Sequence, residues 1–147
     1  MTDWPDHKIR STALFYIEKT LMDRSSWRWS LIGEAHEGLS ERVEFQPGEL
    51  PVVSFFLSEL SWYLLSTRRI VGSYAGQKCD VAVLDVLEGR FPNFKGYGDK
   101  YTEVMTLHIS DGRDVKLEYE TGAASMAPIY YFRYWKIKFP ILDKLIE

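Results

Sequence analysis

One short segment of the sequence has the residue types for acid–base or metal chemistry. Glu34, His36 and Glu37 place two carboxylates beside an imidazole. Such a group can ligate a metal ion or transfer a proton. The neighbouring residues match neither the His-Glu-x-x-His helix motif nor the spacing of a Cys/His zinc site. We therefore interpret the segment as a polar loop, and an enzyme that uses Glu34, His36 and Glu37 is kept as an alternative hypothesis.

The other reactive side chains lack the neighbours that a catalytic site needs. Cys79, the only cysteine, lies between Lys78 and Asp80, whose charges act on a thiol pKa in opposite directions. We expect a passive thiol there. His108 lies on the polar side of a predicted strand, where we expect either cross-strand packing or pairing with a carboxylate of the hairpin. The sequence thus predicts no catalytic residue, no metal site and no cofactor.

A glycine-containing segment, residues 95–100, partly matches the loops that bind phosphate. Gly96 and Gly98 have the G-x-G spacing, but Tyr101 occupies the place of the third glycine and a strand is predicted to follow. Nucleotide binding is therefore rejected. The aromatic and basic residues of the loop instead suit a recognition surface, because aromatic side chains on a scaffolded loop supply contact area. A loop that folds back over the core is the alternative. The residues concerned are Phe91, Phe94, Lys95, Tyr97, Lys100 and Tyr101.

Acidic residues gather in the hairpin that is predicted to follow this loop. Asp111, Asp114, Glu118 and Glu120 could form a negative docking face that attracts a basic partner. The same charges could equally protect an exposed strand from edge-to-edge aggregation. Taken from the loop and the hairpin, the candidate partner-binding residues are Phe94, Lys95, Tyr97, Tyr101, Asp111, Asp114, Glu118 and Glu120.

Two adjacent arginines offer a further anion site. Arg68 and Arg69, together with Lys78, have the charge to bind a phosphate or an anionic lipid headgroup. Neighbouring side chains on a strand point to opposite faces of the sheet, so the two arginines do not form one patch. We expect them to form salt bridges at the surface.

The elements that must position these residues are organised around a predicted hairpin over residues 101–122. Apolar and polar residues alternate on both sides of Asp111-Gly112, and both turn residues tolerate a positive φ. The alternation predicts that one face packs on a core and the other meets water. The residues expected to face the core are Met105, Leu107, Ile109, Val115, Leu117 and Tyr119.

Helices are predicted at the two ends of the chain and strands between them. Helical spacing of apolar residues indicates an amphipathic helix from Asp6 to about Asp23. In the C-terminal segment helix and strand compete, and we favour a helix from about Ala127 that kinks or stops at Phe139. Residues rich in β-branched and aromatic types predict strands between 50 and 75. The other expectations are a short strand over 27–31, a loop over 33–48 that contains one strand at 42–45, a strand or a helix over 80–87, and an ordered loop over 90–100.

Length and composition place the chain in a broad class. Its 147 residues suffice for one domain with a buried core, and we assign residues 1–147 to a single domain. A hydrophobic content of 46% and a charged content of 27% are typical of a soluble globular protein. The net charge of −3 argues against a nucleic-acid partner. A single cysteine fits a reducing compartment, and no apolar stretch reaches the ~18–20 residues of a membrane span. We expect a cytoplasmic protein without stable membrane insertion.

Three segments resemble bacterial PH-like domains. Residues 62–71 contain Thr67-Arg68-Arg69-Ile70, residues 81–86 contain Asp85, and residues 107–112 carry the Asp-Gly corner. The resemblance covers residues 50–135. It implies a bent antiparallel sheet closed by a C-terminal helix, and a role in binding without catalysis. The N-terminal helix and residues 33–48 lie outside it.

Together these observations predict an α+β fold with an N-terminal helix, a bent, mostly antiparallel sheet and a C-terminal helix. For the function, an acidic and aromatic-rich chain without a catalytic constellation favours a non-catalytic module that binds another protein, one with a basic surface if the acidic hairpin is the docking face. One specific form is an immunity-type protein that neutralises a toxin. A PH-like module that binds an anionic lipid headgroup or a small ligand is the alternative, beside the enzyme named above.

Overall fold

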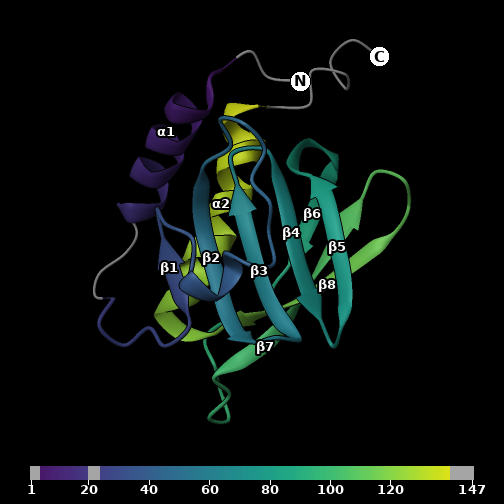
Figure 1. Cartoon of the computed structure of the whole chain (residues 1–147). Coiled ribbons are helices and arrows are strands. Elements are labelled where there is room, and N and C mark those ends of the chain that lie inside the picture. Colours follow the sequence, from purple (N-terminus) through teal and green to yellow (C-terminus); the bar gives the residue numbers. More distant parts are fainter. Residues whose placement is uncertain (1–3, 20–23, 140–147) are drawn as a thin grey trace.

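The protein has an α+β fold, as predicted, in which two helices accompany two antiparallel sheets (Figure 1). The computed structural model describes residues 4–19 and 24–139. The helices are α1 (Asp6–Glu18) and α2 (Met126–Lys138). The strands are β1 (Ser30–Ile32), β2 (Pro51–Ser58), β3 (Ser61–Ser66), β4 (Arg69–Tyr74), β5 (Gln77–Ala82), β6 (Val86–Arg90), β7 (Thr102–Ile109) and β8 (Asp114–Glu120).

The strands follow one another as antiparallel neighbours within each sheet. One sheet has the order β1-β2-β3-β4-β5 and the other the order β6-β7-β8, so the strands divide into two sheets where the sequence suggested a single bent one. The chain passes between the sheets through a 3₁₀ turn at Val83–Asp85. This passage settles the open assignment of residues 80–87, which comprise the end of β5, the turn and the start of β6. A sequence window that crosses three elements has no single periodicity to detect.

The hairpin over residues 101–122 is confirmed. β7 and β8 pair without a register shift from Thr102 opposite Glu120 to His108 opposite Asp114. Gly112 lies at the tip with a φ of 94°, which a residue without Cβ adopts at no steric cost. The alternating apolar residues of both strands are buried, as expected: Met105, Leu107, Ile109, Val115, Leu117 and Tyr119.

Both predicted helices are present. α1 begins at Asp6 and buries Ile9, Ala13 and Ile17 on one face, which is the spacing that predicted it. The described helix ends at Glu18, and most of its predicted extension to Asp23 lies outside the described residues. α2 contacts α1 and lies behind the five-stranded sheet in Figure 1. The Tyr134 hydroxyl lies 2.5 Å from Thr12 Oγ1 and links the two helices.

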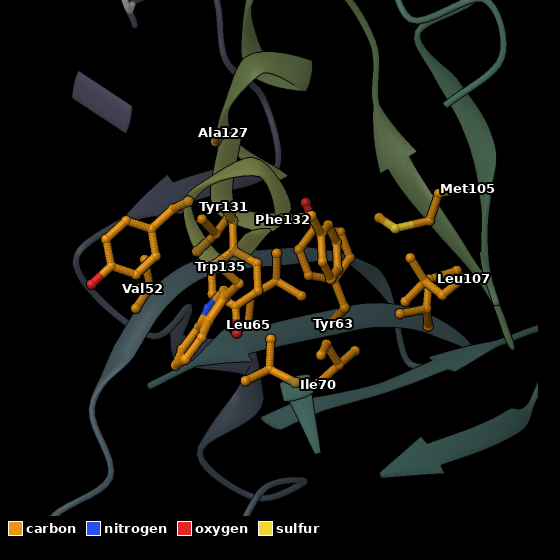
Figure 2. Packing of buried hydrophobic residues seen from close by; sticks show 14 of the residues in the cluster. Val52, Tyr63, Leu65, Ile70, Met105, Leu107, Ala127, Tyr131, Phe132 and Trp135 are labelled. Carbon is orange, nitrogen blue, oxygen red and sulfur yellow. The ribbon is translucent and has the colours of Figure 1, made fainter. Parts of the chain in front are cut away.

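The main core lies where α2 and the two sheets meet. Tyr131, Phe132 and Trp135 project from α2 toward side chains of the sheets, among them Leu65 and Ile70 (Figure 2). The Tyr131 hydroxyl is buried and donates a hydrogen bond of 2.6 Å to the carbonyl of Ser66. Large aromatic side chains on one helix therefore anchor it to the sheet.

The opposite face of the five-stranded sheet is also covered. Leu39 and Val43 pack there against residues of the sheet, namely Phe56, Trp62, Leu64 and Val71. The strand predicted at 42–45 is wrong, because the chain turns at this point and Val43 N–H donates to the carbonyl of Leu39 at 3.0 Å. Leu39 and Val43 are four residues apart because they belong to a turn, and both side chains point toward the sheet. Their packing explains why β3 is buried on both faces.

The two sheets pack closely together at Gly72 of β4. A Cβ atom at this position would lie 2.7 Å from Leu117 Cδ2 of β8 and 2.9 Å from the carbonyl oxygen of Trp62. We expect Gly72→Ala to lower the free energy of unfolding by about 1–3 kcal/mol, because a backbone oxygen cannot rotate away. Urea denaturation measures this effect.

The control for Gly72→Ala is Gly89→Ala in β6. A Cβ at position 89 would lie 3.2 Å from the ends of two side chains, Leu107 and Phe91, which can shift. Its effect should be smaller than that of Gly72→Ala. Equal effects of the two substitutions would contradict the tight packing of backbone and side-chain atoms around Gly72.

Candidate functional site

The loop between β6 and β7, residues 91–101, is the candidate site that the structure defines best. Asn93 holds its centre. The side-chain amide of Asn93 donates to the carbonyl of Tyr97 and to Glu103 Oε2, both at 3.0 Å, and Asn93 Oδ1 accepts the N–H of Tyr97 at 2.9 Å. One asparagine side chain therefore replaces the regular backbone pairing that the loop lacks.

Both limbs of the loop are tied to the segment that follows β8. Gly122 N–H donates to the carbonyl of Phe94 at 2.7 Å, and Thr121 N–H donates to the carbonyl of Tyr101 at 3.0 Å. Thr121 Oγ1 donates to the carbonyl of Lys100 at 2.5 Å. Because residues near both ends of the loop converge on Thr121 and Gly122, the loop is ordered, as the sequence predicted.

The backbone of this loop enters the left-handed region four times. Asn93 and Asp99 have φ values of 49° and 58°, and Gly96 and Gly98 have 79° and 77°. A non-glycine residue in this region costs of order 1 kcal/mol and persists only where the surroundings enforce it. The loop conformation is thus stabilised by its tertiary contacts, and strained residues of this kind gather at functional sites.

Three aromatic side chains of the loop face outward. Tyr97 is 72% exposed, Tyr101 56% and Phe94 36%. Phe91 is the exception, since its ring packs edge-on against Tyr119 at a centroid distance of 5.2 Å. Phe91 therefore lies over the core, whereas the later aromatic side chains are exposed.

A residue that the sequence did not single out completes this surface. Arg28 precedes β1, and its guanidinium lies 4.2 Å from the ring centroid of Tyr101. The two residues are 73 positions apart in the sequence, and neither has a motif that points to the other. The only signal in the sequence for this contact is that arginine and tyrosine side chains often stack on each other at a surface. We call Arg28, Phe94, Lys95, Tyr97, Lys100 and Tyr101 the loop surface.

The carboxylate of Glu120 brings Arg28 to the loop. Glu120 is only 6% exposed, whereas the alternation along β8 had placed it on the solvent side. Its Oε2 accepts the Arg28 N–H at 2.7 Å, and its Oε1 accepts the N–H of Trp29 at 3.1 Å and the hydroxyl of Ser30 at 2.7 Å. The sequence had placed Glu120 among the residues that contact a partner. The structure corrects this, because the chain before β1 covers the carboxylate of Glu120.

The remaining hairpin acids also have partners within the protein. Glu118 accepts hydrogen bonds from the hydroxyls of Ser61, at 2.6 Å, and Thr102. At the hairpin tip, Asp114 Oδ1 lies 2.6 Å from His108 Nδ1, which confirms the pairing expected for His108.

Asp111, the fourth hairpin acid, interacts with Arg113. It accepts the Arg113 backbone N–H at 3.0 Å and the guanidinium at 2.7 Å, and these bonds hold the pKa of Asp111 below its usual value. Asp111 is exposed at the tip, but much of its charge is balanced locally.

The eight candidate residues do not come together at one place. Residues 91–101 of the loop precede the first residue of β7, Thr102. Asp111 and Asp114 lie beyond its last residue, Ile109, at the opposite end of the strand (Figure 1). An eight-residue strand such as β7 spans roughly 25 Å. The structure thus separates the aromatic candidates from the acidic tip of the hairpin.

In the segment with Glu34, His36 and Glu37, the imidazole of His36 has a structural role. The His36 ring stacks on Phe56 at a centroid distance of 5.5 Å, and His36 Nδ1 accepts the Gly38 N–H at 3.5 Å, where it caps a 3₁₀ turn. Glu34 and Glu37 are exposed. Within residues 4–19 and 24–139, no three His, Cys, Asp or Glu side chains lie together as a metal site.

Arg68 and Arg69 form salt bridges, as expected. Arg68 contacts Asp6 with Nη2–Oδ2 at 2.8 Å. Arg69 contacts the buried carboxylate of Glu49 with Nε–Oε2 at 2.9 Å and Asp80 with Nη1–Oδ2 at 2.7 Å. The contact with Glu49 is buried and not at the surface, because the segment before β2 covers it.

Cys79 of β5 is half-buried, and burial raises the pKa of its thiol to about 11. At neutral pH the thiol is therefore protonated, and the protonated form is a poor nucleophile. This is the state expected of a passive thiol.

Comparison of the chain with protein-family models, with characterised proteins and with solved structures gave no match in any of the three. Neither α1 nor α2, the helices in the described part of the chain, has the length and apolar character needed to cross a membrane.

Proposed function

We propose that the protein is a non-catalytic module that binds another protein through the loop surface. The observation that carries this proposal is the rigid presentation of Tyr97, which is 72% exposed on a loop that many hydrogen bonds hold in place. Exposed apolar area that is ordered before binding favours association, because little conformational entropy is lost when the partner arrives. Tyrosine, tryptophan and arginine are the residue types that most often dominate the energy of a protein interface.

The narrower form of this proposal is an immunity-type protein that neutralises a toxin in the cytoplasm. It rests on the composition of the chain and on the lack of a catalytic constellation in the sequence, and a basic toxin would need an acidic docking face. Asp111 and Asp114 at the hairpin tip are the acids that support such a face, and both have an internal partner. The aromatic loop supports protein binding more strongly than the acidic hairpin does.

The alternatives have less support from the side-chain contacts. A PH-like module that binds an anionic headgroup would need donors on Arg68 and Arg69, and both guanidiniums already bind carboxylates. An enzyme would need a free imidazole at His36, which stacks on Phe56 and caps a turn. Protein binding is therefore the function for which the described residues offer an accessible and unused surface.

The test is the substitution Tyr97→Ala. We expect the variant to bind its partner about thirty-fold more weakly, which corresponds to about 2 kcal/mol for an interface residue of this type. Proteins retained from a lysate by the immobilised wild type and by the variant are identified by mass spectrometry, and the affinity of any protein that differs is then measured by calorimetry.

The matched control for Tyr97→Ala is Phe15→Ala. Phe15 on α1 is 73% exposed, and its substitution by alanine removes a similar aromatic area away from the loop surface. A partner that is lost with Tyr97→Ala and retained with Phe15→Ala supports the proposal. A partner that both variants retain at full strength would refute the loop surface as the binding site.

A further inference from the structure

Arg28 differs from most other arginines of the protein in what its guanidinium contacts. It lies over the ring of Tyr101 at 4.2 Å, and this cation–π contact uses no hydrogen-bond acceptor. Within residues 4–19 and 24–139, no ion pair or side-chain hydrogen bond of Arg28 is formed. The arginines that donate to an oxygen acceptor or pair with a carboxylate are Arg10, Arg42, Arg68, Arg69, Arg90 and Arg113.

The position of Arg28 is fixed although its side chain is exposed. The buried Glu120 accepts the backbone N–H of Arg28 at 2.7 Å and that of Trp29 at 3.1 Å. The backbone of Tyr101 is fixed in turn through the bond from Thr121 N–H to its carbonyl at 3.0 Å. Two anchored backbone positions therefore bring the guanidinium to the Tyr101 ring, where its N–H donors are available.

The exposed charged residues of the loop surface and of residues 91–101 have an excess of cations. Lys95 and Lys100 are exposed and have no ion-pair partner among the described residues. Two further acids are engaged inside the protein: Glu103 accepts the Asn93 amide at 3.0 Å, and the buried Glu120 accepts three hydrogen bonds. The exposed charges are therefore the cations Arg28, Lys95 and Lys100 and one acid, Asp99.

We propose that Arg28, held over Tyr101, is a receptor for a carboxylate, and that the binding partner supplies it as an Asp or Glu side chain of an acidic segment. This inference rests on the proposed function and names the chemistry of its partner. A guanidinium binds a carboxylate through two parallel N–H···O bonds, and such bonds are stronger than those between neutral groups. The neighbouring lysines add attraction, and the exposed tyrosine rings contact apolar residues beside the acids.

A nucleic acid would supply anions as well, but the rest of the molecule disfavours it. A polyanion extends beyond the loop surface and therefore also interacts with the rest of a protein whose net charge is −3. A short acidic protein segment interacts with the loop surface alone. The acidic segment is also opposite in charge to the basic partner that the hairpin acids had suggested.

The experiment uses Arg28→Lys, which keeps the charge, loses the planar fork and leaves the backbone N–H that Glu120 accepts. A phage-displayed library of random dodecapeptides is selected on the immobilised wild type and on Tyr97→Ala, and the enriched peptides are synthesised. We expect peptides rich in Asp and Glu that bind Arg28→Lys about ten-fold more weakly or worse. The control is Arg133→Lys, since Arg133 is exposed on α2 with its guanidinium 5.3 Å from the ring of Tyr130. This variant should bind as the wild type does.

The outcomes separate the inference from the function beneath it. Peptides that depend on Tyr97 but are not acidic, or that bind Arg28→Lys as tightly as the wild type, overturn the carboxylate receptor and leave protein binding intact. The absence of any peptide enriched on the wild type over Tyr97→Ala counts against both. Single-stranded oligothymidine that binds the wild type and fails to bind Arg28→Lys would assign the receptor to phosphate, and the acidic protein segment would be refuted.

Discussion

Glu49→Ala is expected to lower the free energy of unfolding by about 3–5 kcal/mol, because the mostly buried Arg69 loses its buried partner and keeps only the exposed Asp80. Glu49 is 5% exposed and binds Arg69 through two contacts, Nε–Oε2 at 2.9 Å and Nη2–Oε1 at 3.0 Å. The same carboxylate accepts the Ser66 hydroxyl at 2.5 Å and the Gln46 N–H at 3.0 Å. Its removal therefore also frees two donors that water does not reach easily. Urea denaturation followed by tryptophan fluorescence measures the loss.

The pKa of Glu49 gives a second readout of the same contact. Burial raises this pKa, but the hydrogen bonds from Arg69, Ser66 and the Gln46 N–H outweigh burial, and the pKa lies below the ordinary value of 4.5. A lowered carboxyl pKa stabilises the folded protein at pH values above the ordinary pKa. This stabilisation is lost as the pH falls below about 4.5 toward the pKa of the folded state. Wild-type stability should lose this contribution in acid, and Glu49→Ala should lack it at any pH.

The control for Glu49→Ala is Glu44→Ala. Glu44 lies on the same segment with an exposed side chain, and Arg69 contacts only its backbone carbonyl, at 2.7 Å. Its substitution should change the free energy of unfolding by less than about 0.5 kcal/mol. If Glu49→Ala were as mild as Glu44→Ala, the buried pair with Arg69 would not hold the segment before β2.

The second large effect is expected for Glu120→Ala, at about 3–5 kcal/mol of unfolding free energy. Removal of the buried carboxylate leaves the N–H groups of Arg28 and Trp29 and the hydroxyl of Ser30 without their acceptor. A buried donor that is left unpaired costs about 1–3 kcal/mol, and the freed segment can recover part of this from water. Because Arg28 then loses its fixed position, the variant should also bind the acidic peptides more weakly.

Amide hydrogen exchange distinguishes this role from a general loss of stability. In the wild type the Arg28 and Trp29 amides should exchange slowly, and in Glu120→Ala they should exchange faster than the amides of β3 do. Glu88→Ala is the control, since Glu88 on β6 has an exposed side chain 3.7 Å from Arg90. Slow exchange at Arg28 and Trp29 in Glu120→Ala would contradict the role of Glu120 as the link between β8 and the chain before β1.

Much of the fold follows from local patterns. The apolar alternation on both sides of Asp111-Gly112 predicts β7 and β8, and the spacing of Ile9, Ala13 and Ile17 predicts α1. These patterns are reliable because each depends on residues close together in the chain, where backbone geometry alone sets the period. The loop over 90–100 is predicted for the same reason, from its glycines and proline.

Other features depend on residues far apart in the sequence. Glu120 continues the polar side of β8 in the sequence, yet the chain before β1 covers it and uses its carboxylate. Val43 lies in a segment with a weak strand pattern, yet it packs with Leu39 on the outer face of a sheet. In both cases a distant segment decides whether the side chain meets water, and no local period contains that information.

The amino-acid sequence by itself determined the fold class, the two helices and the central hairpin, because these follow from composition and short-range spacing. Only the tertiary structure decided which charges stay accessible. It directed Glu49, Glu118 and Glu120 toward internal donors, and it placed Arg28 over Tyr101 with its own donors unpaired among the described residues. The physical reason is that a charge is satisfied by whichever groups lie within a few ångströms of it, and the folding of distant segments brings those groups together.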